Sequence, residues 1–264
     1  MKTAYTNPFQ STRATGHEGF TLLDLLVVVG VLSVLIALQM PAWAGGKSQS
    51  KIGICASHVR QLALASQIYA NDNRDKLPVL SGSASWAWDL PVSVADVLLN
   101  SGATTNTFYC PGTAPRFTEK ENWATTSSLW NYGGSSGFRT VGYALAFSGA
   151  TSVLATTNQN TTMLPERITL TSGTVIFSPS ERVLVADATL SDAATVPGYL
   201  IPGNNYVNVA GGFTQNGLLY PHVSPHLKGV VPVGGNLGFK DGHAAWRKFE
   251  LMTPRNITGK VFWW

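Results

Sequence analysis

The residues with the clearest chemical potential stand near the start of the chain, where Asp24 lies inside an apolar stretch formed by residues 22–40. A carboxylate in hydrocarbon is costly unless it has a partner, so its presence there indicates a function. Cleavage after Gly19 would create a partner, because the new α-amino group of Phe20 would precede Asp24 by four residues. That spacing lies on one face of a helix, and between stacked subunits the amine of one chain could meet the carboxylate of another.

The apolar stretch has the length expected of a membrane helix. About 20 residues with a rise of roughly 1.5 Å each span a hydrocarbon core of about 30 Å. Lys2 and Arg13 outnumber Glu18 in the preceding segment, so this positive end is expected to stay in the cytoplasm. The sequence therefore predicts a transmembrane helix over residues 20–41 and export of the remainder of the chain.

Residues 19–29, with the sequence GFTLLDLLVVV, resemble the type IV prepilin signal shared by pilins and type II secretion pseudopilins. In that family a peptidase at the inner membrane cuts after the glycine and N-methylates the new phenylalanine. The resemblance implies that Gly19 is the cleavage residue, Phe20 the methylated first mature residue and Asp24 the assembly carboxylate, where the family nearly always has Glu. Pro41 matches a helix-breaking proline that many members carry.

The resemblance implies a structural subunit and not an enzyme. Such a subunit waits in the bacterial inner membrane with its globular domain in the periplasm, and is processed by the prepilin peptidase and N-methyltransferase. It then packs with other pilin or pseudopilin subunits into a type IV pilus or a type II secretion pseudopilus, in the periplasm or at the cell surface. No cofactor is expected, and the sequence has no His-Glu-x-x-His metalloprotease motif.

An ordinary signal peptide is the alternative interpretation. The segment Ala42-Trp43-Ala44 resembles the small-residue cleavage site of such peptides, and a cut after Ala44 would release an exported binding domain, soluble or membrane-anchored. The eight tryptophans make polysaccharide a candidate ligand for that domain. However, the apolar stretch exceeds the roughly 7–15 residues of a signal peptide's apolar region, and Asp24 would have no explanation. The prepilin interpretation is therefore favoured.

The composition argues against a nucleic-acid partner. The formal net charge is +4, yet charged residues make up only 12% of the chain, about half the typical share of roughly 25%. Lys and Arg are scattered and form no basic run. Gly, Ser, Thr and Asn take the place of charged residues, which suits an exported domain that packs against copies of itself.

The remaining pattern predicts an α+β fold, in which a long N-terminal helix packs on an antiparallel β-sheet of pilin-like type. After a leader over residues 1–19, one helix is expected over about residues 20–73, with a membrane half (20–41) and an amphipathic half (42–75). The globular β-rich domain occupies residues 76–264. The amphipathic stripe has spacings of three and four and comprises Ile52, Cys55, Val59, Leu62, Ser66 and Tyr69.

Within the globular domain, a capping box at residues 93–96 predicts a helix over residues 94–100. Strands are expected where β-branched and aromatic residues alternate with turn formers, at 141–147, 174–177, 182–186, 206–209, 237–240, 244–249 and 260–264. Asp241-Gly242 predicts a tight hairpin turn. Residues 148–166 and 188–205 are expected to be surface loops, and the aromatic segment 262–264 is expected to pack into the sheet.

Several further blocks resemble large pilin-like proteins of the Planctomycetes–Verrucomicrobia group. The segment CASHVRQL at residues 55–62 corresponds to their helix end, and FYCP at 108–111, VLVAD at 183–187 and GFKDGH at 238–243 are similar to later blocks. These blocks spread over nearly the whole chain, so the resemblance indicates the class of protein without defining an individual role.

Two sets of residues could bond to one another or to a metal. Cys55 and Cys110 permit one disulfide, which would contribute about 3–4 kcal/mol by closing a large loop in an oxidising compartment, and the alternative is two buried thiols too far apart to bridge.

The second set comprises Asp187, His226, Asp241 and His243, which could converge at strand ends and bind a divalent metal. Calcium prefers oxygen ligands, so two imidazoles suit it poorly. The favoured interpretation is structural, with Asp187 capping a loop, Asp241 forming a turn and His243 on the surface.

Overall fold

The computed structural model describes residues 19, 21–81, 88–132, 137–149, 154–192, 204–215, 218–255 and 260–264, with only the backbone described at 37–45 and 211–215. The chain divides into two units, residues 1–46 and 47–264. Residues 1–18 of the leader and Phe20 lie outside the described residues, as does most of the loop predicted at 188–205. The predicted α+β class is confirmed, since an N-terminal helix is combined with antiparallel sheets.

Helix α1 comprises Leu22–Asp72, within two residues of the predicted bounds, and it includes Pro41. It ends where Arg74 and Asp75 adopt left-handed backbone angles, with φ of 57° and 60°. No helix in the described part of the chain is both long enough and apolar enough to cross a membrane. The membrane half of the prediction is therefore unconfirmed.

The amphipathic stripe on the second half of α1 is confirmed. Cys55, Val59, Leu62 and Ser66 are buried, and Ile52 is half-buried at the edge of the same face. This face packs into the hydrophobic core of the larger unit. The spacing of three and four residues therefore predicted correctly which side of the helix meets the globular domain.

A four-stranded antiparallel sheet forms the centre of this unit, in the order β13-β12-β6-β3. Its strands are β3 (Tyr143–Leu145), β6 (Val183–Asp187), β12 (Gly234–Phe239) and β13 (Ala244–Lys248). The register pairs Ala186 with Ala144 on one side and with Leu237 on the other. The Asp241-Gly242 turn between β12 and β13 is confirmed, with Gly242 at φ of 86°.

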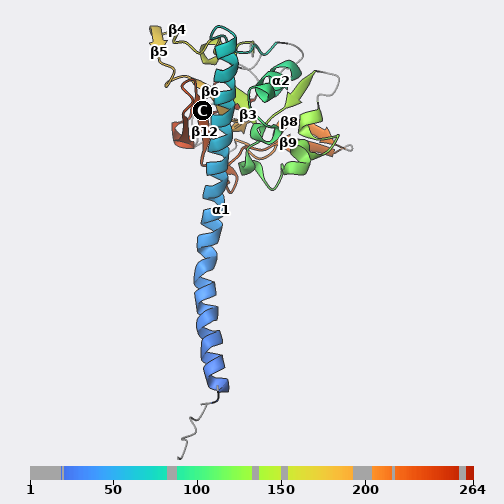
Figure 1. Cartoon of the computed structure of the whole chain (residues 1–264), viewed down its shortest axis with the longest axis vertical. Helices are drawn as coiled ribbons and strands as arrows, with labels where there is room; N and C mark the ends of the chain where they lie inside the picture. The colour runs from blue at the N-terminus through green and yellow to red at the C-terminus, as the bar shows by residue number, and fades with distance from the viewer. Residues whose placement is uncertain are drawn as a thin grey trace, which may run out of the picture. The chain divides into compact units, whose positions relative to one another are not determined.

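Helix α1 lies directly against β12, close to the labels of β6 and β12 in Figure 1. A Cβ atom on Gly238 would stand 2.8 Å from Val59 Cγ1 and 3.0 Å from the Val59 carbonyl oxygen. Gln67 donates to the Lys240 carbonyl at 2.6 Å, and Asn236 donates to the Ile52 carbonyl at 3.2 Å. Two side-chain hydrogen bonds thus flank a backbone contact that only glycine permits.

The other elements are short and surround this centre. The two-stranded pairs are β1 (Asp89–Pro91) with β2 (Phe138–Thr140), β4 (Glu166–Leu170) with β5 (Gly173–Phe177), β7 (Leu190–Ser191) with β14 (Val261–Phe262), β8 (Val209–Gln215) with β9 (Leu218–His222), and β10 (Leu227–Lys228) with β11 (Val231–Pro232). The helices are α2 (Val92–Asn100) and α3 (Leu129–Tyr132), a π-helical turn at Lys120–Ala124, and 3-10 turns at Thr105–Phe108, Pro111–Thr113, Thr156–Asn158 and Phe249–Leu251.

Two local predictions were wrong for identifiable reasons. Helix α2 begins at Val92 after Pro91, which makes no side-chain cap bond, so Ser93 lies inside the helix and is not its cap. The predicted strand at 206–209 is mostly a turn, because the Asn205 side chain accepts hydrogen bonds from the backbone N–H groups of Val207 and Asn208. At α2 the proline before the helix, and at residues 206–209 the hydrogen bonds of the Asn205 side chain, determined the backbone in place of the predicted pattern.

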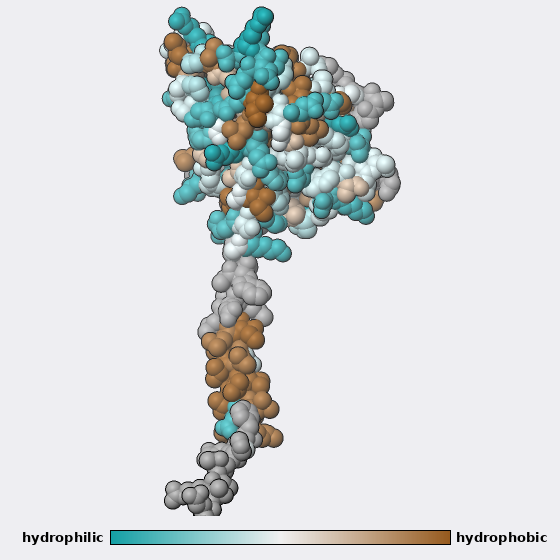
Figure 2. All heavy atoms as spheres, viewed as in Figure 1, coloured by the Kyte–Doolittle hydropathy of each residue, from teal (hydrophilic) through white to brown (hydrophobic). Residues whose placement is uncertain are grey.

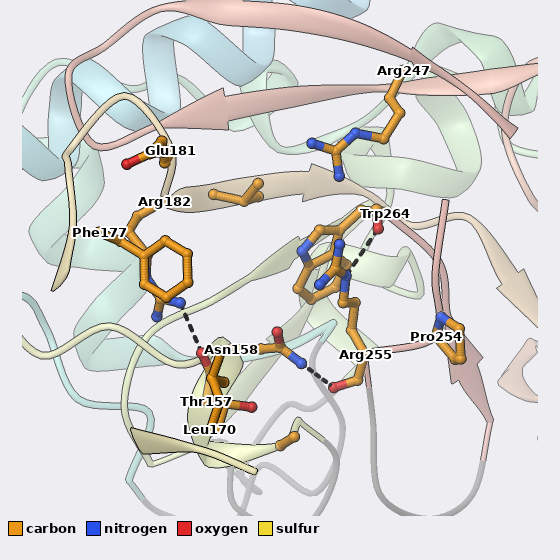
Figure 3. Close-up of a pocket in the computed structure, with 12 residues that line it drawn as sticks. Thr157, Asn158, Leu170, Phe177, Glu181, Arg182, Arg247, Pro254, Arg255 and Trp264 are labelled. Atoms are coloured by element: carbon orange, nitrogen blue, oxygen red, sulfur yellow. Dashed lines mark hydrogen bonds between the residues drawn. The ribbon is translucent and has the colours of Figure 1, made fainter. Parts of the chain in front are cut away.

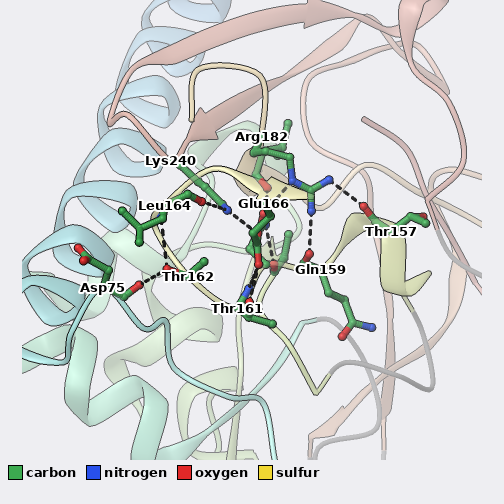
Figure 4. A network of polar contacts seen from close by, with 12 residues as sticks. Asp75, Thr157, Gln159, Thr161, Thr162, Leu164, Glu166, Arg182 and Lys240 are labelled. Carbon is green, nitrogen blue, oxygen red and sulfur yellow. Dashed lines mark hydrogen bonds and ion pairs between the residues drawn. The ribbon is translucent and has the colours of Figure 1, made fainter. Parts of the chain in front are cut away.

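The surface-loop prediction for residues 148–166 holds for exposed positions such as Leu164 but was wrong for Gln159 and Asn160, which are buried. The cause is the buried guanidinium of Arg182, which requires acceptors inside the protein. Arg182 donates to Asn160 Oδ1 at 3.0 Å and to the carbonyls of Thr157 and Gln159 at 2.7 Å each (Figure 4). Residues 157–160 fold around this cation, while Thr161 and Leu164 after them are exposed.

A second buried cation extends the same network (Figure 4). The Lys240 side chain is fully buried and donates to the Glu166 carboxylate and to the Leu164 carbonyl. Burial lowers the pKa of Lys240, partly offset by the pairing with Glu166. Burial also raises the pKa of Glu166, but hydrogen bonds from Lys240 and Thr161 outweigh burial and hold that pKa below its usual value. Glu166 is therefore ionised at neutral pH, opposite the Lys240 amine.

The packing prediction for the segment 262–264 is confirmed. Phe262, Trp263 and Trp264 are buried, and Trp88 is buried against Phe262. These rings fill the core, which removes them as exposed surfaces for stacking on a sugar.

Adding a side chain at Gly238 should separate α1 from the sheet. We expect Gly238→Ala to lower the free energy of unfolding by about 1–3 kcal/mol, because Val59 Cγ1 and the helix backbone cannot move aside cheaply. Gly53→Ala is the matched control, since a Cβ there meets nothing within 4 Å. It should stabilise the helix by about 0.5–1 kcal/mol. Urea unfolding measures both, and equal effects would contradict the tight contact.

Acid sensitivity should depend on Glu166. A carboxyl with a lowered folded-state pKa stabilises the fold above its unfolded value, near 4.5, and this contribution is lost as the pH falls through the folded pKa. Glu166→Gln should therefore cost about 1–3 kcal/mol at neutral pH and flatten the loss of stability below about pH 4.5. Urea unfolding across pH tests this, with exposed Glu250→Gln as the control. An unchanged pH slope in Glu166→Gln would refute it.

Candidate functional site

The carboxylate of Asp24 has hydrogen-bond partners at the start of α1. Its Oδ2 accepts the Thr21 backbone N–H at 3.0 Å and the Thr21 hydroxyl at 2.8 Å, while the Thr21 hydroxyl oxygen accepts the Asp24 N–H at 3.2 Å. This reciprocal arrangement is a capping box. Thr-x-x-Asp before an apolar run is its sequence signature, so the sequence carried a signal for this role of Thr21.

The first turns of α1 expose apolar side chains on every side. Leu22, Leu23 and Leu26 are 81%, 70% and 67% exposed, and the large side chains up to Ile36 are all about half exposed or more. Figure 2 shows this segment as a continuous brown band. A helix that is apolar all round is normally buried. The segment is therefore expected to be surrounded by other apolar groups when the protein functions.

A second candidate site lies inside the larger unit, where four polar side chains meet. Cys55 comes from α1, Cys110 from the chain before the 3-10 turn at Pro111–Thr113, Asp187 from the end of β6, and His226 from the chain before β10. All four are buried, and their nearest ligand atoms lie within 4.8 Å of one another. We call these four residues the buried cluster.

Hydrogen bonds connect the members of the buried cluster in a chain. The Cys55 thiol donates to Asp187 Oδ1 at 3.0 Å, and His226 Nε2 lies 3.4 Å from Asp187 Oδ2. The same His226 nitrogen lies 3.2 Å from Cys110 Sγ. The Asn236 N–H donates to Asp187 Oδ2 at 2.6 Å. Asp187 thus contacts a thiol, an imidazole and a backbone donor at once.

The backbone is shaped to admit His226. Its φ of 53° lies in the left-handed region, which is uncommon for a residue other than glycine. A Cβ on Gly112 would stand 2.7 Å from two ring atoms of His226. The Trp246 ring lies edge-on to the imidazole at 5.3 Å. A strained backbone and an adjacent glycine together hold the imidazole over Cys110 and Asp187.

The electrostatics of the buried cluster depend on burial and on Asp187. Burial lowers the pKa of His226, but its bond to Asp187 and the charge of that carboxylate outweigh burial and raise the pKa to about 9. Burial, contact with Cys55 and the charge of Asp187 raise the pKa of Cys110 well above its usual value. At neutral pH His226 is therefore a cation paired with Asp187, and Cys110 is a neutral thiol.

The buried cluster combines the cysteine pair with Asp187 and His226, which were considered from the sequence as two separate sets. Cys55 and Cys110 are buried free thiols in this structure, and their sulfur atoms lie within 4.8 Å of each other. A disulfide between them stays a prediction. Tyr143, whose hydroxyl lies 3.4 Å from Cys55 Sγ, was not predicted, and no sequence signal pointed to it.

Asp241 and His243 do not join Asp187, in line with the favoured interpretation of Asp241 as a turn former and His243 as a surface residue. They pair with each other at the surface, 2.6 Å apart. The reason is topological: β12 is antiparallel to β6 and pairs Phe239 with Val183, so the turn after β12 lies at the opposite end of β6 from Asp187.

A cleft of about 520 Å³ lies near the Arg182 network (Figure 3). Arg182, Arg247 and Arg255 line it, together with Glu181. Arg255 donates to the Trp264 carbonyl at 2.8 Å, and burial together with the other two arginines lowers its pKa to about 10.

The comparisons with known proteins give a short similarity. A stretch of 57 residues, 22% of this chain, is 34% identical to type II secretion system core protein G of Pseudomonas aeruginosa. The chain covers 40% of the length of that relative. No family model matches the chain. No solved structure matches it either. The similarity supports the pseudopilin-like resemblance over that part of the chain.

Removal of the Asp187 carboxylate should be severely destabilising. In metal-free buffer, Asp187→Leu leaves the Asn236 N–H and the His226 cation buried without their acceptor, and we expect a loss of about 3–5 kcal/mol in the free energy of unfolding. Asp187→Asn should cost less because an amide oxygen still accepts. Asp241→Leu, at the exposed pair, should stay within about 0.5 kcal/mol. Similar losses for Asp187→Leu and Asp241→Leu in urea unfolding would contradict this account.

Proposed function

We propose that this chain is a prepilin-like structural subunit that assembles through α1 into a type IV pilus or a type II secretion pseudopilus, without enzymatic activity of its own. The observation that carries the proposal is the exposed apolar segment at the start of α1. Near its beginning, the Asp24 carboxylate forms a capping box with Thr21. Side chains exposed all round a helix can be covered when helices of several subunits surround it, as in a bundle. A single docking face would leave the other sides in water.

The short similarity to type II secretion system core protein G supports partners of the same class, namely other pilin or pseudopilin subunits. In this proposal the subunit waits in the bacterial inner membrane with its globular unit in the periplasm. The prepilin peptidase cuts after Gly19 and methylates Phe20, and the subunit then enters a filament in the periplasm or at the cell surface. The proposal thus includes the inner membrane and the prepilin peptidase among the partners of this chain.

The chemistry of the helix start gives Asp24 a defined task. Cleavage after Gly19 would place a cationic amine on Phe20, next to the positive end of the helix dipole, where a cation is unfavourable. A carboxylate at Asp24 offsets that charge, either within one chain or between neighbouring subunits. N-methylation would keep the positive charge on the amine. The Thr21–Asp24 capping box lies after the cut, so it would remain in the mature chain.

Mass spectrometry of the mature N-terminus tests the processing step. We expect methylated Phe20 as the first residue in cells that contain a prepilin peptidase, and uncut chain in cells that lack it. A mature terminus at Gly45 would instead identify an ordinary signal peptide and an exported binding domain, and would refute the filament proposal. Proteomics of sheared filaments then tests whether the processed chain is a filament component.

Asp24 variants separate assembly from helix capping. Asp24→Ala should leave cleavage intact and reduce the yield of sheared filaments at least tenfold. Asp24→Asn retains an oxygen for the Thr21 N–H but loses the charge, so it should fail like Asp24→Ala if the charge pair drives assembly. Thr21→Val is the matched control, because it removes the capping hydroxyl while the carboxylate stays. Normal filament yield with Asp24→Ala would show that the charge pair is not required.

A further inference from the structure

We propose that Cys55, Cys110, Asp187 and His226 bind one zinc ion that has a structural role. Thiolate sulfur, imidazole nitrogen and carboxylate oxygen are the three ligand types that Zn²⁺ takes in proteins, usually four at a time in a tetrahedron. This inference concerns the interior of the larger unit and is independent of the proposed assembly of α1. It explains why two cysteines, a histidine and an aspartate from four separate segments meet in a core that is otherwise largely apolar.

The spacing of the donor atoms is close to that of a tetrahedral zinc site. Zinc–ligand bonds of about 2.0–2.3 Å place the donors of a tetrahedron roughly 3.3–3.8 Å apart. Here Cys110 Sγ lies 3.2 Å from His226 Nε2, Cys55 Sγ lies 3.0 Å from Asp187 Oδ1, and His226 Nε2 lies 3.4 Å from Asp187 Oδ2. All four donors lie within 4.8 Å of one another, so side-chain adjustments of up to about 1 Å would seat the ion at their centre.

The ligand types select zinc over other divalent cations. Two sulfur donors disfavour calcium and magnesium, which take oxygen ligands. Four protein ligands leave no open position for water, as in structural zinc sites. All four residues are buried, so the ion would be enclosed by protein. The chemistry is therefore that of a cross-link between α1, the end of β6 and two connecting segments.

Groups around the ligands suit the charge of such a site. Two thiolates and one carboxylate around Zn²⁺ carry a net charge of −1, which needs hydrogen-bond donors nearby. The Gly112 N–H donates to Cys110 Sγ at 3.3 Å, and the Tyr143 hydroxyl lies 3.4 Å from Cys55 Sγ. The Asn236 N–H donates to Asp187 Oδ2. Each anionic ligand thus has a donor outside the coordination shell.

Formation of the site is a proton-for-metal exchange. Cys55 and Cys110 each lose the thiol proton to solvent, and His226 binds through Nε2 only after that nitrogen has given up its proton. No bond is oxidised or reduced. A disulfide between the same two sulfurs would instead consume both thiol ligands, so zinc binding and disulfide formation exclude each other.

The test begins with the full-length chain, purified under reducing conditions, stripped of metal and then supplied with zinc. Inductively coupled plasma mass spectrometry should find one zinc ion per chain. X-ray absorption at the zinc edge should show two sulfur ligands at about 2.3 Å and two nitrogen or oxygen ligands at about 2.0 Å. Replacement by Co²⁺ should give thiolate-to-cobalt charge-transfer absorption and the spectrum of a tetrahedral ion. These measurements need no variant that might fail to fold.

Variants then assign the ligands. Loss of a group that hydrogen-bonds a zinc ligand weakens binding roughly 10–100-fold, and we expect Tyr143→Phe to fall within that range. Cys110→Ser and Asp187→Asn remove or weaken a ligand itself, so they should weaken zinc binding by more. The double variant Asp241→Asn with His243→Gln is the matched control, because it changes the same residue types at an exposed pair and should bind zinc like the parent.

Three outcomes would overturn the proposal. The first is an absorption spectrum without sulfur ligands, and the second is equal zinc affinity in the parent, Cys110→Ser and Asp187→Asn chains. The third is an exported protein whose Cys55 and Cys110 are joined by a disulfide and which takes up no zinc. Each of these leaves the filament proposal untouched, because the latter is tested by the N-terminus and by filament yield.

Discussion

The close approach of α1 to β12 is the constraint on which the rest of the larger unit depends. At Gly238 the sheet presents bare backbone, and Val59 of the helix occupies the space where a side chain would stand. The hydrogen bonds of Gln67 and Asn236 fix the helix along its axis on either side of this contact. Cys55 lies one turn before Val59, so the same contact brings its thiol to Asp187 at the end of the neighbouring strand.

Buried charged side chains hold distant segments of this unit together, although the chain contains few charged residues. Only 12% of the residues are charged, yet Arg182, Lys240 and Asp187 are all buried. Each buried charge is surrounded by carbonyl, amide or ionic partners contributed by segments distant in sequence. An unpaired charge in such a place would be very unfavourable, so these residues specify which segments must come together.

The sequence predicted features that depend on local periodicity and failed where partners come from different elements. The stripe of Cys55 and Val59 reflects the helical repeat, and the Asp241-Gly242 turn reflects backbone preferences. The strands β6, β12 and β13 were found by their β-branched and aromatic residues. The cluster was not predicted as one site, because the meeting of Cys110 with His226 depends on chain paths between elements that no spacing encodes.

Topology also decides what the sequence left open. Asp187 and Asp241 both stand at strand ends, and the antiparallel order of β6 and β12 places them at opposite ends of the sheet. The buried position of Asn160 depends on Arg182, which lies 22 residues further along the chain. By contrast, the role of Thr21 as a helix cap was a purely local signal that could have been recognised from Thr-x-x-Asp.

The capping box also bears on how a peptidase would meet the chain. Proteases act most readily on segments that are exposed and not held in regular structure. Thr21 and Asp24 cap the helix, whose first residue is Leu22. Gly19 itself is exposed and lies outside the helix. The capping box therefore marks the boundary between the helix and Gly19, the residue after which the proposed cut falls.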